Sequence, residues 1–182
     1  MIDMADFAQA VASILVWEGG YVNNPADNGG ETYAGISRKN WPQWQGWAIV
    51  DSFKKTYPNL NDLNQALSSS ATLAGQVQDF YHVNFWHYDG IKCQEIANKL
   101  LSLEVISSSA ARLAQQSLLE LGVQVVVDGR WGPKTQDAIN AQKEADVLHM
   151  LRAFASLKFA EIVINNNGQH QFLKGWLKRA TD

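Results

Sequence analysis

WEGGYVNNPADNGGETYAGIS, residues 17–37, joins the end of an apolar helical pattern to a polar, glycine-rich loop. The residues before it carry apolar side chains at helical spacing: Phe7, Val11, Ile14 and Leu15. This spacing predicts an amphipathic helix with one buried stripe. Gly19-Gly20 supplies the residue type that commonly ends helices. We therefore expect a helix, Glu18 at its end, and then a loop or small hairpin.

Glu18 is a candidate catalytic acid. It lies three residues after Leu15 and four after Ile14, so we expect it on or beside the buried stripe. Burial favours the protonated form of a carboxyl group. Glycosidic bond cleavage needs such an acid to protonate the leaving oxygen. The alternative is an ordinary solvated acid at a helix end, which the residue pattern alone leaves open.

A second carboxylate is available in the loop. Asp27 lies nine residues after Glu18, Glu31 follows it, and Thr32 comes five residues after Asp27. A second acidic group can stabilise positive charge on the sugar or direct a water molecule at it. The loop lacks the alternating oxygen ligands and closing glutamate of a helix-loop-helix calcium site. The pattern therefore favours acid–base chemistry over a calcium loop.

The run from Glu18 to Ser37 resembles the opening signature of glycoside hydrolase family 108, bacterial and phage N-acetylmuramidases with a lysozyme-like helical fold. The sequence FLKGWLKR, residues 172–179, is similar to the F-x-x-G-W-x-x-R ending of that family's second region, called a predicted peptidoglycan domain. By this resemblance, Glu18 matches the family's catalytic glutamate. Asp27 and Thr32 resemble the rest of the phage-lysozyme catalytic triad, whose last gap is one residue longer.

The resemblance implies a mainly α, lysozyme-like fold and cleavage of the β-1,4 bond between N-acetylmuramic acid and N-acetylglucosamine. Glu18 would donate the proton, Asp27 would orient a water or stabilise the charged sugar, and Thr32 would help to position that water. Glu31 would be the second carboxylate if Asp27 points away. The spacing does not determine the distance between the carboxyl groups, so inversion and retention both stay open.

Four further residues are candidate substrate contacts: Tyr21, Glu31, Tyr33 and Trp44. Trp44 stands in a cluster with Trp41 and Trp47, and indole faces can stack on the apolar faces of sugars. The same spacing of three residues also fits one helix face that buries itself.

The sequence departs from the family pattern at two places. A Lys-Tyr-Gly-like run is replaced by Tyr33-Ala34-Gly35, and an Asp with an Asn-x-Gly group is replaced by Leu103–Ser109. Two alternatives to hydrolysis stay open. A lytic transglycosylase would use Glu18 alone, and a wall-binding or secretion-accessory protein would keep the fold without catalysis.

Length and periodicity suit one compact unit with two lobes, which we place at residues 1–91 and 92–182. Further helices are expected at 59–67, 72–88, 94–106, from Ala110 to Gly122, at 136–144 and 146–165, and near the C-terminus. The motif DGRWGPKT, residues 128–135, resembles the turn of small peptidoglycan-binding modules, with Thr135 or the turn before it as the cap of the next helix. It equally fits a plain Gly/Pro turn.

Composition limits the partners. The net charge is −3, with 4 basic and 9 acidic residues in 1–91 against 11 and 9 in 92–182. We expect bacterial peptidoglycan as the partner, no nucleic acid, no integral membrane segment and a monomer. His82 and His87 are five apart, which does not suit two ligands on one helix face, so we expect no metal and no cofactor.

The N-terminus carries Asp3 and Asp6 where a signal peptide would carry positive charge. We expect synthesis in the bacterial cytoplasm without a signal peptide. Action on the cell wall would then require holin-type or other release, as for a phage endolysin. Cys93 is the single cysteine, so no internal disulfide forms.

Overall fold

The computed structural model describes residues 4–23 and 30–182. Within these residues helices predominate, and the strands form one small antiparallel sheet of order β1-β2-β3. The predicted mainly α fold with a hairpin region after the first helix is confirmed. Contacts divide the chain into two compact units. The N-terminal unit is Phe7–Trp86, and the C-terminal unit is His87–Asp182 with residues 4–6.

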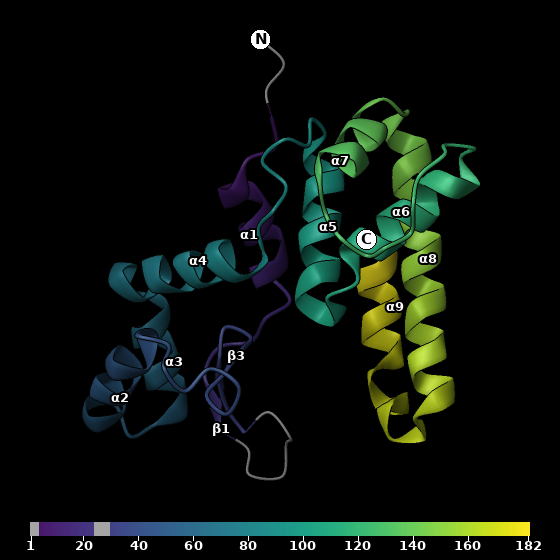
Figure 1. The fold of residues 1–182 in the computed structure, drawn as a ribbon. Coiled ribbons are helices and arrows are strands. Elements are labelled where there is room, and N and C mark those ends of the chain that lie inside the picture. Colours follow the sequence, from purple (N-terminus) through teal and green to yellow (C-terminus); the bar gives the residue numbers. More distant parts are fainter. Residues whose placement is uncertain (1–3, 24–29) are drawn as a thin grey trace. The chain divides into compact units, whose positions relative to one another are not determined.

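The N-terminal unit packs four helices and the sheet (Figure 1). Its elements are α1 (Phe7–Leu15), β1 (Val22–Asn23), β2 (Glu31–Tyr33), β3 (Ile36–Ser37), α2 (Gly46–Thr56), α3 (Leu60–Ser68) and α4 (Ala71–Phe85). Helix α4 contacts α1, α2 and α3. Its start is fixed by Ser70, whose side chain accepts a hydrogen bond from the Leu73 amide. Helix α4 is therefore the central support of this unit.

The sheet is short but its register is defined. Val22 pairs with Thr32, and Tyr33 pairs with Ile36. The second pairing leaves a two-residue turn of Ala34 and Gly35, with φ of 47° and 77°. Two consecutive positive φ values are those of a type I′ hairpin turn, which suits the twist of paired strands.

One local expectation, and one alternative that the sequence left open, are wrong in this unit. Helix α1 ends at Leu15, three residues before Glu18, because the Trp17 amide donates to the Ile14 carbonyl in a tighter turn. The tryptophans near Trp44 do not share a helix face, because α2 begins only at Gly46 and the Trp44 amide donates three residues back to Trp41.

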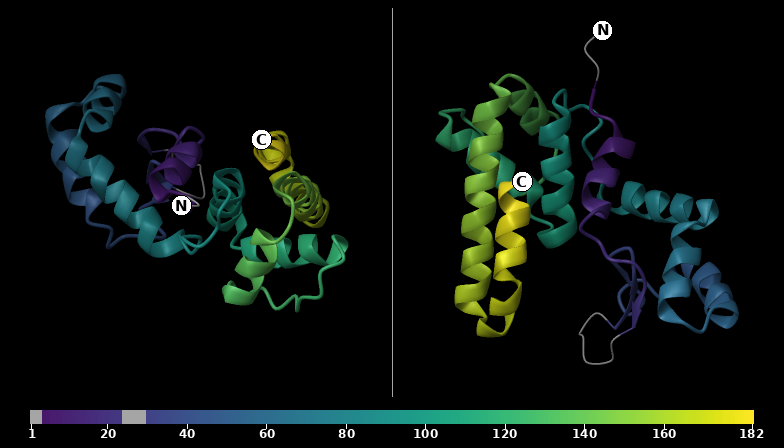
Figure 2. Two further views of the ribbon diagram at one scale, coloured as in Figure 1. Left: turned by 90° about the horizontal axis from the view of Figure 1, so that it is seen from above. Right: turned by 180° about the vertical axis from the view of Figure 1, so that it is seen from behind.

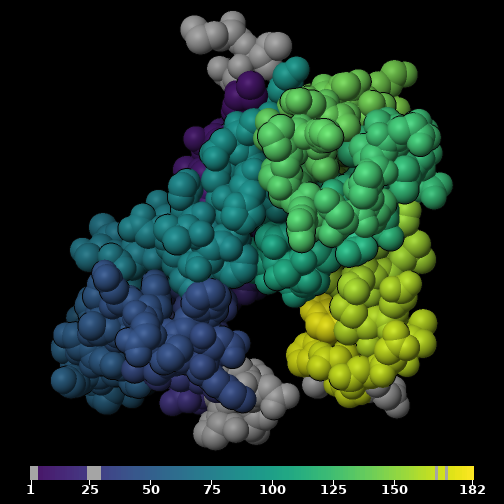
Figure 3. All heavy atoms as spheres, viewed as in Figure 1, coloured from purple at the N-terminus to yellow at the C-terminus, as the bar shows by residue number. Residues whose placement is uncertain are grey.

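The C-terminal unit is entirely helical in its regular structure. Its elements are α5 (Gln94–Ser107), α6 (Ala110–Glu120), α7 (Pro133–Asn140), α8 (Glu144–Asn165), the 3-10 helix η1 (Asn167–Phe172) and α9 (Leu173–Thr181). Helices α8 and α9 lie side by side in every view (Figures 1 and 2), and Figure 3 shows their atoms packed against each other. Buried side chains such as Leu100, Leu118, Leu151 and Phe159 form the core.

The predicted break at Ser107–Ser109 is confirmed, since Ser108 ends α5 in the left-handed region. Of the two predicted caps of the next helix, Thr135 is wrong and the turn before it is confirmed, since the N-cap is Gly132. Helix α7 begins at Pro133, whose missing amide costs nothing at the first helical position. Thr135 is buried, and its hydroxyl instead accepts a hydrogen bond from Gln115.

One buried lysine ties α9 to α5. The Lys99 ammonium donates hydrogen bonds to the carbonyl oxygens of Arg179 (2.9 Å) and Ala180 (3.1 Å), near the C-terminal end of α9. Lys99 is only 6% exposed. Burial, and then the positive charge of Arg152, lower the pKa of Lys99 from 10.5 to about 8.

The free energy of unfolding should therefore rise with pH between about 7.5 and 9.5, and more in wild type than in Lys99→Met. In this window the unfolded chain keeps a proton that folded Lys99 releases, so higher pH disfavours unfolding. The difference between the two proteins should grow by about 1–2 kcal/mol. Urea titrations across this range measure it. Parallel pH dependences of wild type and variant would contradict the role given to Lys99.

Candidate active site

Glu18 lies in the turn between α1 and β1 and is half-buried. Its neighbour Trp17 is 39% exposed. The backbone around Glu18 is fixed from both sides, because the Trp17 amide donates to Ile14 and the Gly19 carbonyl accepts from the Ala34 amide at 3.1 Å. Glu18 is thus held between the first helix and the hairpin turn, with part of its side chain open to solvent.

The carboxyl group of Glu18 lies against Gly35. A Cβ atom on residue 35 would be 2.6 Å from Glu18 Oε2 and 2.6 Å from the Tyr81 hydroxyl oxygen. Tyr81 is 1% exposed, and its hydroxyl donates a 2.8 Å hydrogen bond to the Ala34 carbonyl. Since such short distances to a Cβ do not occur in real proteins, only glycine lets this carboxyl group and hydroxyl gather at the turn.

Tyr81 and Gly35 are the neighbours of the Glu18 carboxyl group that sequence reasoning missed. Tyr81 belongs to the apolar stripe of α4, which predicts burial but not where its hydroxyl points. Gly35 belongs to the Ala34-Gly35 pair, which predicts a hairpin turn. The pair does not predict that an acidic side chain lies against the glycine. The positions of residues 18, 35 and 81 in the sequence do not predict that they lie close together in the fold.

Glu31 is enclosed by positively charged and hydroxyl groups. Lys54 Nζ lies 2.6 Å from Oε1 and Arg38 Nε lies 2.6 Å from Oε2. The Tyr21 hydroxyl donates to Oε1 at 2.8 Å, so two predicted substrate contacts, Tyr21 and Glu31, contact each other. Burial by itself raises the pKa of Glu31, but the hydrogen bonds from Lys54 and Tyr21 and the nearby charges outweigh it. The net effect is a lowered pKa, which keeps Glu31 ionised.

Arg38 extends this network to α2. Its guanidinium donates to both carboxylate oxygens of Asp51, at 3.0 and 2.6 Å. This bidentate hydrogen bonding lowers the pKa of Asp51. The guanidinium also lies 4.4 Å from the centre of the Trp47 ring, a cation–π distance. The network connects β2 firmly to α2.

Thr32 lies between Glu31 and Tyr33 on β2, so its side chain points to the opposite face of the strand. Its hydroxyl donates a long hydrogen bond of 3.4 Å to the Gly30 carbonyl oxygen. Asp27, the other predicted catalytic partner, lies outside the described residues. The structure thus brings Glu31 together with Tyr21. Thr32 is on the opposite face of β2 and is therefore not part of this pair.

Tyr33 and Trp44 form an aromatic pair with ring centres 6.5 Å apart and planes at 16°. Beyond Trp44 the surface opens into a pocket of about 520 Å³. It is lined by Asn40, Trp41, Pro42, Gln43, Trp44, Gln45, Gln76, Asp79, Phe80, Val83 and Asn84. The Trp44 indole donates to the Gln76 carbonyl at 3.2 Å, which fixes the ring. An aromatic wall beside amide and carboxylate groups is chemistry that suits a sugar.

Within residues 4–23 and 30–182, no cluster of His, Cys, Asp or Glu has the arrangement of a metal site. In the same part of the chain, none of the helices combines the length and apolar character that crossing a membrane requires.

Comparisons with known proteins place this geometry in a family. The family model described as Glycosyl hydrolase 108 matches residues 11–107, which include Glu18, Gly35 and Tyr81. The chain belongs to glycosyl hydrolase family 108. It is therefore a glycoside hydrolase, and the predicted resemblance is confirmed. A second model, described as Predicted Peptidoglycan domain, matches residues 109–181. This second match supports peptidoglycan as the partner of this family 108 protein.

Among solved structures, the chain is similar to one described as the structure of Brucella abortus SagA. The TM-score is 0.61 at 24% sequence identity, over 96% of this chain and 89% of that one. This likeness shows that the two share a fold. A search of curated protein sequences gives no match.

Proposed function

We propose that this protein is a lysozyme-type N-acetylmuramidase that cleaves the β-1,4 bond between N-acetylmuramic acid and N-acetylglucosamine in peptidoglycan. The observation that carries the proposal is the Glu18 carboxyl group, held against Gly35 beside the Tyr81 hydroxyl in a family 108 domain. A fixed, partly covered acid is what protonation of a glycosidic oxygen needs.

In this mechanism Glu18 donates its proton to the leaving oxygen. Asp27 orients a water molecule or stabilises the oxocarbenium-like sugar, and Thr32 helps to position that water. The contacts of Glu31 support Asp27 as the second carboxylate. Both Glu31 oxygens already contact cations, and a carboxylate that neutralises Lys54 and Arg38 is a poor partner for a developing positive charge.

Among the predicted contacts, Trp44 fits a glycan directly, since its half-buried ring lines a pocket that carries polar groups for sugar hydroxyls. Tyr33 is 8% exposed and stacks against Trp44, so it supports that ring from behind. Tyr21 and Glu31 act by holding β2 in place next to that ring. We further propose that the protein is a monomeric endolysin, released from the cytoplasm by a holin-type route.

The test is mass spectrometry of soluble fragments from purified peptidoglycan, treated with wild type and with Glu18→Gln. Fragments with reducing N-acetylmuramic acid ends from wild type alone would support the proposal. Anhydro-muropeptides would instead identify a lytic transglycosylase. A lack of fragments from walls of several species would reject an enzyme and leave a wall-binding protein.

The endolysin role has a separate test. Expression in bacterial cytoplasm should leave cells intact until the membrane is permeabilised, for example by chloroform, and lysis should then follow. Lysis without permeabilisation would reject the dependence on release.

A further inference from the structure

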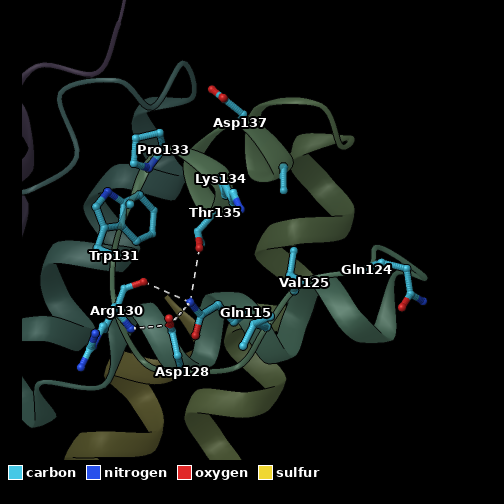
Figure 4. Close-up of a pocket in the computed structure, with 13 residues that line it drawn as sticks. Gln115, Gln124, Val125, Asp128, Arg130, Trp131, Pro133, Lys134, Thr135 and Asp137 are labelled. Atoms are coloured by element: carbon cyan, nitrogen blue, oxygen red, sulfur yellow. Dashed lines mark hydrogen bonds between the residues drawn. The ribbon is translucent and has the colours of Figure 1, made fainter.

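The largest pocket described in the C-terminal unit lies between α6, α7 and the segment that joins them. It has a volume of about 1000 Å³, at the upper end of the range for small-ligand sites. Figure 4 shows Trp131 and Val125 on opposite sides of it, with Gln115 and Thr135 between them. Val126, Pro133 and Ala138 add further apolar lining. The family model described as Predicted Peptidoglycan domain covers the residues of this pocket, but it does not say which part of the wall polymer would bind here.

The pocket is built by Gln115, a buried residue of α6. Its amide nitrogen donates to the Asp128 carboxylate (2.8 Å), the Arg130 carbonyl (3.1 Å) and the Thr135 hydroxyl (3.3 Å). Its oxygen accepts from the Gly129 amide at 2.8 Å. One buried side chain thus fixes the whole DGRWGPKT turn, so the pocket is formed before any ligand arrives. Preorganisation of this kind lowers the entropic cost of binding.

Trp131 is fixed as well. Its ring meets the buried Tyr88 ring edge-on, with centres 4.8 Å apart and planes at 86°. The indole is half-buried and therefore keeps one surface toward the pocket. A rigid aromatic wall supplies contact area at little entropic cost.

One edge of the pocket has backbone groups available for pairing. Residues 124–127 form no helix or strand, and none of their backbone groups pairs with another backbone group in the described chain. Val126 is 78% exposed, and exposure alternates along this segment as in a strand with one covered face. Such an edge can exchange hydrogen bonds with amide groups of an extended peptide. The stem peptide of peptidoglycan contains a γ-linked D-glutamate, so these are separate hydrogen bonds and not a regular strand ladder.

The rim carries both signs of charge. Arg130 and Lys134 supply positive charge, and Asp128 and Asp137 supply negative charge. Hydrogen bonds from the Arg130 amide and then Gln115 lower the pKa of Asp128 and keep it ionised. Both bonds go to Oδ1. No ion pair within residues 4–23 and 30–182 involves any of these four residues. They match a ligand that itself carries carboxylates and an amino group.

We propose that this pocket binds the stem peptide of peptidoglycan, in an extended conformation along residues 124–127. The peptide carboxylates would contact Arg130 and Lys134, its free amino group would contact Asp128, and its apolar side chains would lie on Trp131. This inference rests on the proposed function in that peptidoglycan supplies the peptide. It assigns the peptide to the C-terminal unit, while the glycan belongs to the N-terminal unit.

The experiment is an NMR titration of the full ¹⁵N-labelled chain with the synthetic tripeptide L-Ala–γ-D-Glu–meso-diaminopimelate. Signals of the amides of residues 124–127 and of the Trp131 indole should shift. Lys134→Gln and Arg130→Gln should each weaken binding about tenfold, as expected for loss of a charge-assisted contact. Both side chains are exposed, so these variants should fold normally.

Lys143→Gln is the matched control, because Lys143 is also exposed and in the same unit but does not line the pocket. It should change affinity less than about twofold. Equal weakening by all three variants, or shifts confined to other residues, would overturn the proposal. A neutral chitin tetrasaccharide that shifts the pocket signals in place of the peptide would overturn it too. Wall hydrolysis by wild type without peptide binding would reject this inference and leave the proposed function standing.

Discussion

Glu18→Gln should lower turnover of peptidoglycan about 1,000-fold or more, with little change in wall binding. Glutamine has nearly the same shape as glutamate but has no acidic proton, so it cannot protonate the leaving oxygen. The half-buried position of Glu18 means that the amide should replace the acid without unfolding the turn. Release of dye-labelled wall fragments measures turnover, and sedimentation with insoluble peptidoglycan measures binding.

The matched control is Glu104→Gln in α5, which is also half-buried and acidic but lies in the C-terminal unit. Its activity should stay within a few-fold of wild type. A Glu18→Gln variant with wild-type turnover would show that another group supplies the proton. Loss of both turnover and wall binding would show that the variant is misfolded, and circular dichroism would verify that outcome.

Gly35→Ala should be the second most damaging substitution, although it adds only one methyl group. The new Cβ would lie 2.6 Å from both Glu18 Oε2 and the Tyr81 hydroxyl. The carboxyl group must therefore move, and a displacement of about 1 Å at a reacting group can cost about 100-fold in rate. The φ of 77° adds backbone strain of about 1–2 kcal/mol. We expect kcat to fall about 100-fold together with a lower Tm.

Gly122→Ala separates these two effects. Gly122 has a φ of 80°, but a Cβ there would meet no atom within 4 Å. The Gly122→Ala variant should therefore lose about as much free energy of unfolding as Gly35→Ala does from backbone strain, but its turnover of peptidoglycan should be unchanged. Tyr81→Phe provides a second comparison, because it removes the hydroxyl and leaves the ring that packs in α4. Equal kcat in Gly35→Ala and Gly122→Ala would contradict the proposed role of the close approach to Glu18.

Short-range patterns were enough to predict most of the helices. The stripes of α4 and α8 follow from apolar spacing, and the end of α5 follows from its serine run. Helix ends were less predictable, because they depend on single hydrogen bonds. The tighter turn at Trp17 ends α1 early, and Pro133 starts α7 three residues before the expected position.

The candidate site was predicted only in part, because its contacts join residues that are far apart in the sequence. Glu18 stands in a specific motif and could be found from the sequence, although its catalytic role remains a prediction. The Tyr81 hydroxyl beside it comes from a distant position on α4. In the separate network of Glu31, the contacts to Lys54 and Arg38 form only after β2 and α2 pack. The same limit applies to the C-terminal pocket, where Gln115 contacts a turn 13–20 residues away. Such contacts depend on tertiary structure, which no local pattern encodes.

The Ala34–Gly35 turn has a consequence for engineering this protein. Because side chains alternate along paired strands, inserting or deleting one residue at the turn would shift β3 against β2 and reverse its faces relative to that strand. The contact between Glu31 and Arg38, which follows β3, would be lost together with the close approach of Gly35 to Glu18. A substitution in this turn can reduce activity by a small or a large amount, but an insertion or deletion would disrupt the site completely. Libraries that aim to alter specificity should keep this turn at two residues and vary the aromatic wall instead.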